Sequence, residues 1–87
     1  MELKDIKRII KGIIVKKMKD KDKGQALAYD TPLLSVGIDS IFALSILVEI
    51  EEYFSVEIDD NDLNMDRVKD ISSFAEMINS YLEKSRG

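Results

Sequence analysis

The residues that could do chemistry centre on one serine at the start of an apolar stretch. Ser40 ends the tetrad Gly37-Ile38-Asp39-Ser40. A nucleophilic serine needs a positioned base and a group that orients this base. The chain has no His, and it contains neither a Ser-x-x-Lys nor a Gly-x-Ser-x-Gly motif. We therefore expect no catalytic residue and interpret Ser40 as a hydroxyl that another protein modifies.

A second candidate site is the acidic stretch with Asp60, Asp62 and Asn64. This spacing resembles the start of a calcium-binding loop, which requires Gly at the sixth position and Glu at the twelfth. Counting from Asp60, these positions hold Met65 and Ile71. We therefore predict no metal site and interpret the stretch as a solvated acidic turn.

A helix predicted over residues 40–54 must present Ser40. Asp39 precedes it and is a good N-cap, because its negative charge suits the positive end of the helix dipole. At about 100° per residue, one side forms the predicted core face. This face holds Ala43, Ile46, Leu47, Ile50 and Phe54.

The opposite side of the same helix is also apolar in its first half. It holds Ile41, Leu44 and Val48, with Glu51 and Glu52 beside them. Two interpretations are open: the preceding connection covers these side chains, or they form an exposed patch with an acidic rim that partner proteins read. The adjacency of Ser40 favours the second interpretation.

The remaining segments also favour helices. We predict a helix over residues 3–18, a connection over 19–38, an extended bridge over 55–58, a helical turn over 60–65 and a last helix over 69–82. Gly12 suggests close packing of the first helix against a neighbour. The expected fold class is all-α: a small four-helix bundle with three main helices, one short third helix and a long loop between helices 1 and 2.

Apolar side chains are expected to bury these segments. The first helix should use Leu3, Ile6, Ile9, Ile10, Ile13 and Met18, the connection Leu27, Tyr29, Leu33, Leu34 and Val36, and the last helix Val68, Ile71, Phe74, Ala75, Ile78 and Leu82.

Composition and charge fit a single domain over residues 1–87. The chain has no Cys, no apolar run of about 18 residues and no apolar signal core at its N-terminus, so we expect a cytoplasmic monomer without a membrane span. Residues 1–24 hold nine Lys or Arg and four Asp or Glu, a net charge of +5, whereas residues 25–87 hold four and thirteen, a net charge of −9. An acidic domain is a poor nucleic-acid binder, so we expect no nucleic-acid partner.

The segment Gly37-Ile38-Asp39-Ser40-Ile41 resembles the signature of the carrier proteins, which comprise acyl carrier proteins and the peptidyl carrier domains of nonribosomal peptide synthesis. The resemblance extends over residues 33–80. It includes the turn at residues 54–58, the acidic short helix and the closing helix with Val68, Ile71 and Phe74.

This resemblance implies a covalent cofactor. Ser40 would receive a 4′-phosphopantetheine arm from coenzyme A, added by a phosphopantetheinyl transferase, and the arm's thiol would hold the cargo as a thioester. Asp39 matches the acid that helps to position the transferase's metal ion, and Gly37 gives the turn room. The phosphate would lie at a helix N-terminus, where an anion is favoured.

The resemblance also makes the helix over residues 40–54 the docking element. Its docking residues would be Ile41, Phe42, Leu44, Val48, Glu51 and Glu52. Carriers of fatty acid synthesis usually have acids where this chain has Phe42 and Ser45, so we expect a stand-alone carrier of a specialised route, served by an acyl- or aminoacyl-loading ligase and downstream acyl-transfer enzymes. The alternatives are a carrier of fatty acid synthesis and an unmodified helical adaptor.

Overall fold

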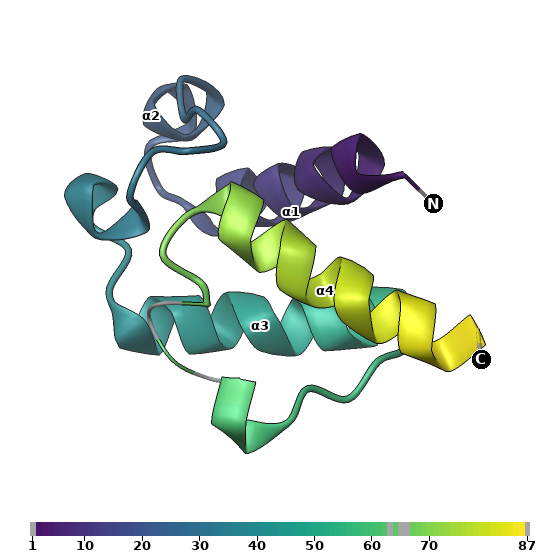
Figure 1. Cartoon of the computed structure of the whole chain (residues 1–87). Coiled ribbons are helices and arrows are strands. Elements are labelled where there is room, and N and C mark those ends of the chain that lie inside the picture. The colour runs from purple at the N-terminus through teal and green to yellow at the C-terminus, as the bar shows by residue number, and fades with distance from the viewer. Residues whose placement is uncertain (1, 63, 65–66, 87) are drawn as a thin grey trace.

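The computed structural model describes residues 2–62, 64 and 67–86, and in this part of the chain all regular structure is helical (Figure 1). The three long helices are α1 (Leu3–Lys17), α3 (Ser40–Phe54) and α4 (Ile71–Arg86). Between them lie the short helix α2 (Lys21–Gln25) and two 3₁₀ turns, η1 (Leu33–Val36) and η2 (Asp60–Asp62). The predicted all-α bundle is confirmed.

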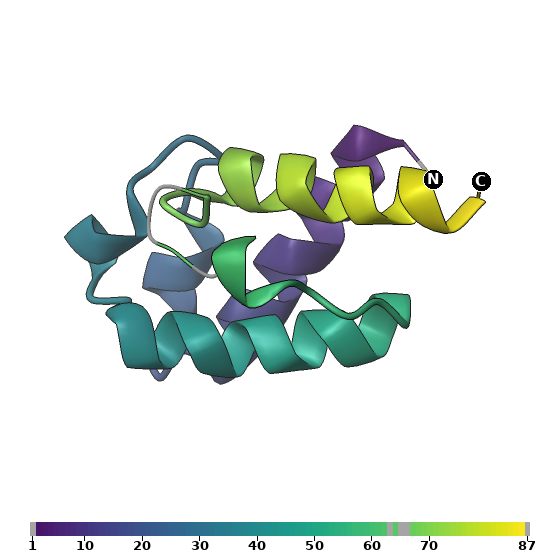
Figure 2. The ribbon, with the colours of Figure 1, turned by 60° about the horizontal axis from the view of Figure 1, so that its bottom comes forward.

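The three long helices enclose one core. Figure 2 shows α3 and α4 running in the same direction on two levels, with α1 crossing behind them. Ile6, Ile10 and Ile14 of α1 are fully buried, because residues four apart lie on the same side of a helix and this side faces the core. Ile46 and Ile50 of α3 and Phe74 and Ile78 of α4 complete the centre of the core. Ile14 and Met77 are fully buried although the predicted stripes omit them.

The helix boundaries follow local signals in the sequence. The predicted helix over residues 40–54 is confirmed at both ends. The last helix begins two residues later than predicted, because the Asp70 carboxylate accepts a hydrogen bond of 2.7 Å from the backbone N–H of Ser73 and so caps it. It also continues to Arg86, because residues 83–86 include neither Gly nor Pro. The predicted turn over 60–65 is seen as η2, and Met65 lies outside the described residues.

The corner between α1 and α2 corrects two predictions. The segment 19–38, predicted as a connection without a helix of its own, contains α2, because the Asp20 carboxylate accepts the N–H of Lys23 at 3.1 Å and caps it. Close helix packing occurs at Gly24, where an added Cβ would lie 3.1 Å from Val15 Cγ2 and 3.2 Å from Met18 Sδ. At Gly12 no described atom lies within 4 Å of an added Cβ. The close packing predicted at Gly12 is therefore wrong.

The rest of the connection is fastened to the start of α4. The N–H of Leu33 donates to the carbonyl of Lys69 at 2.8 Å, and the N–H of Ser72 donates to the carbonyl of Tyr29 at 2.9 Å. Leu27 and Leu33 are buried as predicted, but Tyr29 and Leu34 remain exposed. A single 3₁₀ turn buries only one of two adjacent leucines, because neighbouring side chains point in different directions. These contacts fix the turn that leads into α3.

Candidate functional site

The turn before α3 places Ser40 at the open end of the bundle. Gly37 ends η1 with φ 85°, a left-handed conformation that glycine adopts without strain. The next residue, Ile38, is buried and donates its N–H to the carbonyl of Leu33 at 3.1 Å. Gly37 thus makes the turn and the buried Ile38 anchors it, so that Asp39 and Ser40 lie at the surface.

Asp39 caps α3 as predicted. Its Oδ1 accepts the backbone N–H of Phe42 at 2.8 Å, and its carbonyl accepts that of Ala43 at 2.9 Å. The first N–H groups of a helix have no partner within the helix. Because Asp39 takes the N–H of Phe42, those of Ser40 and Ile41 remain at the exposed helix end within the described part of the chain. The positive end of the α3 dipole therefore lies beside the Ser40 hydroxyl.

The Ser40 hydroxyl is exposed at the first residue of α3. The sequence has no His to act as a base, and the described residues contain no group of three or more acidic, His or Cys side chains that could hold a metal ion. An exposed hydroxyl at the N-terminus of a long helix suits a covalently attached phosphate, because backbone N–H groups and the helix dipole both stabilise an anion there.

An exposed apolar stripe begins next to Ser40. It is formed by Ile41, Leu44 and Val48, which are 77%, 49% and 53% exposed. The long connection leaves these side chains uncovered, so the interpretation in which it covers them is wrong. Leu34 is 63% exposed in the turn before Gly37 and is a further apolar side chain at this end. Its exposure was missed because a Leu-Leu pair does not indicate which leucine is buried.

The other predicted docking residues, Phe42, Glu51 and Glu52, and the neighbouring Ser45 differ in how exposed they are. Glu52 is exposed, as a rim residue should be, whereas Glu51 is half-buried and its Oε2 accepts the N–H of Ile58 at 3.0 Å. Phe42 is half-buried and packs against the core. Ser45 is exposed, and its hydroxyl donates to the carbonyl of Phe42 at 2.7 Å. Glu51 and Phe42 thus hold the structure behind the stripe.

The acidic turn at η2 is held by protein donors. The Tyr81 hydroxyl donates to Asp62 Oδ2 and accepts the N–H of Asp59 at 2.9 Å. Asp62 Oδ1 lies 3.0 Å from the Arg67 guanidinium. The hydrogen bond to the Asp62 carboxylate, followed by burial, raises the pKa of Tyr81, because both favour the neutral phenol. Both Asp62 oxygens are therefore engaged in holding the turn.

None of the described helices is both long and apolar enough to cross a membrane.

Comparison with known proteins agrees with the geometry at the start of α3. No curated protein matches this chain significantly. The model of the family described as phosphopantetheine attachment site matches residues 8–78, a range that contains α2, α3, most of α1 and the first half of α4. The chain therefore belongs to this family of carrier proteins, whose members are not enzymes and bear a covalently attached 4′-phosphopantetheine.

Proposed function

We propose that Ser40 is the residue that carries the 4′-phosphopantetheine arm. The observation that supports this most is the exposed Ser40 hydroxyl at the N-terminus of α3, directly beside the exposed stripe of Ile41, Leu44 and Val48. The group fits these residues: the serine oxygen is open to solvent, and the N–H groups of Ser40 and Ile41 lie at the positive helix end that stabilises a phosphodiester.

The side chains around Ser40 determine how the arm is added and used. Since the chain provides no base, the transferase removes the hydroxyl proton, and the Ser40 oxygen displaces the nucleotide part of coenzyme A at phosphorus. Asp39 is held in place by the N–H of Phe42 at 2.8 Å, so its carboxylate is oriented to help position the transferase's metal ion. When attached, the arm supplies a thiol that holds the cargo as a thioester, a group that this Cys-free chain otherwise lacks.

The proposed docking surface is the exposed stripe together with Glu52. Apolar side chains that remain in water and are bordered by a charge are typical of surfaces that bind partner proteins. Phe42 and Glu51 act from behind this surface: Phe42 packs on the core and Glu51 accepts the N–H of Ile58. The partners would be the transferase, a loading ligase and downstream acyl-transfer enzymes.

We further propose that residues 1–87 form one carrier domain that serves a specialised route. Continuous burial from Ile6 of α1 to Ile78 of α4 supports one domain. The neutral Ser45 on the exposed side of α3 and the core-packed Phe42 support an amino-acid or polyketide-like cargo, because neither offers the negative charge that is usual in carriers of fatty acid synthesis. Mass spectrometry of the arm on protein purified from its native source would distinguish an aminoacyl from a fatty acyl cargo.

The attachment site is tested with a broad-specificity transferase and coenzyme A, followed by intact mass measurement. We expect the mass of one arm on the wild-type chain and no gain on Ser40→Ala. A gain that persists in Ser40→Ala would falsify the assignment.

The same experiment separates a carrier from an unmodified adaptor. An adaptor would show no mass gain in the wild-type chain, and its partner binding would survive Ser40→Ala. Leu44→Asp should slow modification by disturbing the docking surface while leaving Ser40 in place, and circular dichroism of this variant provides the control for folding.

A further inference from the structure

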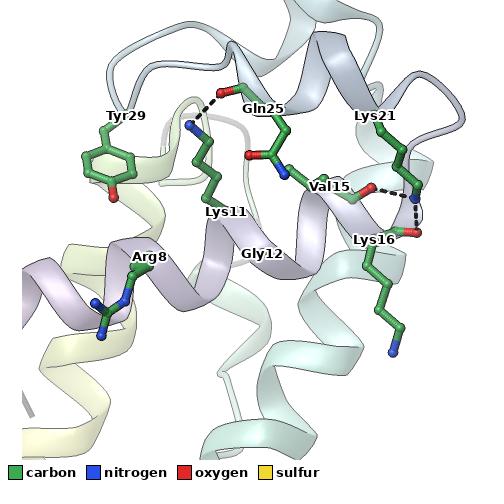
Figure 3. Close-up of a pocket in the computed structure, with 8 residues that line it drawn as sticks. All are labelled: Arg8, Lys11, Gly12, Val15, Lys16, Lys21, Gln25 and Tyr29. Carbon is green, nitrogen blue, oxygen red and sulfur yellow. Dashed lines mark hydrogen bonds between the residues drawn. The ribbon is translucent and has the colours of Figure 1, made fainter.

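A basic hollow lies at the corner between α1 and α2, and none of its lining residues belongs to α3 or to the turn at Ser40. It has a volume of about 640 Å³ and opens broadly to the surface. Figure 3 shows Gly12 and Val15 on the α1 side, with Gln25 and Tyr29 opposite them. The function proposed above does not use this hollow.

The charged side chains that line the hollow are all basic, although Lys16 also lines a neighbouring hollow together with Glu49 and Glu52. Its lining includes Arg8, Lys11, Lys16 and Lys21 and, among the described residues, no acidic side chain. Arg8 pairs with Asp5 at 3.1 Å, but this pair lies largely in water and is weak. Lys16 forms no ion pair within the described part of the chain. The hollow therefore presents a local positive potential on a chain whose net charge is −4.

Two of the ammonium groups are fixed in place. Lys11 Nζ donates to the carbonyl of Gln25 at 2.9 Å, and Lys21 Nζ donates to the carbonyls of Val15 and Lys16 at 2.8 and 2.7 Å (Figure 3). An ammonium has three donors, so Lys11 retains two and Lys21 retains one. Because these side chains are already ordered, an anion that binds them pays less of the entropy cost of immobilising them.

The hollow also offers apolar surface. Gly12 lacks a side chain, so the α1 backbone is open at this point, and apart from its neighbours in α1 itself no described atom lies within 4 Å of an added Cβ. The Tyr29 ring is partly exposed, and the ammonium groups of Lys7 and Lys11 lie 5.8 and 6.0 Å from its centroid. An occupant that carries both carboxylates and apolar side chains would match this combination of cations, open backbone and aromatic ring.

We propose that this hollow is a second docking site, which binds an acidic amphipathic segment of a partner protein. A protein segment fits better than a free small molecule, because small-ligand sites enclose most of their ligand and this hollow is broad and open. It also fits better than nucleic acid, because single-stranded nucleic acid is usually bound by stacking successive bases on several aromatic side chains, and Tyr29 is the one aromatic residue among the residues that line this hollow. A partner bound here would hold the carrier while leaving Ser40 and its stripe free.

The probe is a short fluorescein-labelled peptide in which Glu alternates with Leu, titrated into the full chain. We expect saturable binding that weakens with salt, and backbone amide shifts in NMR spectra that cluster around Lys11, Gly12 and Gln25. Arg8→Gln combined with Lys16→Gln should weaken binding roughly fivefold to tenfold. The matched control, Lys4→Gln with Lys19→Gln, removes the same charge outside the hollow and should weaken it less than about twofold.

Gly12→Met tests the hollow without harming the fold. Methionine fills the open space over α1 and is a better helix former than glycine, so binding should fall while thermal stability stays equal or rises. Equal losses in both double variants, or amide shifts that map to Ile41 and Leu44, would overturn the proposal.

Further arms test the identity of the occupant. Oligouridine, or vesicles of phosphatidylcholine and phosphatidylserine, that bind more tightly than the peptide would refute a protein segment as the occupant. Because Ser40 is not involved, Ser40→Ala should bind the peptide like the wild type, so failure here and failure of the attachment-site assignment are separate results.

Discussion

At the scale of single residues, two adjacent acids on α3 have different tasks. Glu51 is half-buried, and its carboxylate accepts the N–H of Ile58 at 3.0 Å, so it fastens the segment that leaves α3. Glu52 is exposed, and its carboxylate forms no hydrogen bond within the described part of the chain. Only the second is free to contribute charge to a docking surface without a structural side effect.

We therefore predict that two alanine variants differ in their free energy of unfolding. Glu51→Ala should lower the free energy of unfolding by about 1–2 kcal/mol, because it leaves the N–H of Ile58 without its charged acceptor. Glu52→Ala should change it by less than about 0.5 kcal/mol. Urea unfolding of both variants provides the measurement, and equal losses would show that the hydrogen bond to Ile58 contributes nothing.

At the scale of elements, side chains fasten the connection between α3 and α4 in addition to its own backbone hydrogen bonds. The Tyr81 hydroxyl of α4 contacts both Asp62 of η2 and the N–H of Asp59 before it. Figure 2 shows this segment passing along the side of α3 and α4. Tyr81 therefore joins η2 to the last helix.

The raised pKa of Tyr81 gives a stability that depends on pH. The folded state favours the neutral phenol, mainly through the hydrogen bond to Asp62, so the pKa of Tyr81 lies above the usual 10.0. Its contribution is complete below the unfolded-state pKa and is lost as pH rises through the folded-state pKa. Tyr81→Phe should lower the urea midpoint at neutral pH, and should lose less stability than the wild type as the pH rises above the unfolded-state pKa of about 10.

The control for this experiment is Tyr53→Phe. Tyr53 is 60% exposed, and its hydroxyl makes no hydrogen bond to the described residues. Removal of this hydroxyl should leave the neutral-pH midpoint unchanged. Parallel pH curves for wild type and Tyr81→Phe would contradict the role of the Asp62 hydrogen bond.

At the scale of the whole molecule, basic and acidic side chains gather in different places. Basic residues of the N-terminal segment line the hollow beside α1 and α2, and the acids near the exposed stripe lie on the second half of α3. The two groups meet where Lys17 Nζ lies 3.4 Å from Glu49 Oε1. Charges arranged in this way steer partners of opposite charge to different faces. On the proposed assignment of Ser40, the transferase approaches the start of α3, and its association should therefore respond to charge on α3.

Glu52→Lys should slow association with the transferase by about two- to fivefold at low salt, with little change in the dissociation rate, because rim charges act mainly on encounter. Glu76→Lys on α4 makes the same change in net charge at another exposed position and should have a smaller effect. Stopped-flow kinetics over a range of ionic strengths provide the measurement. A rate that does not depend on salt would exclude steering by Glu52.

The sequence by itself determined the features that depend on near neighbours in the chain. The bounds of α3, the Asp39 cap and the left-handed turn at Gly37 follow from the residue types and a helical period, because caps and turns form from adjacent residues. The lack of His, together with the position of Ser40 before an apolar helix, was enough to predict that another protein modifies this hydroxyl.

Only the tertiary structure decided which of two residues of the same type is packed, buried or hydrogen-bonded. Gly24 and not Gly12 is packed closely, Leu33 and not Leu34 is buried, and Glu51 and not Glu52 is engaged. The basic hollow likewise exists only because α2 folds back beside α1. These outcomes depend on where distant segments come to lie, and a local pattern of residue types does not contain that position.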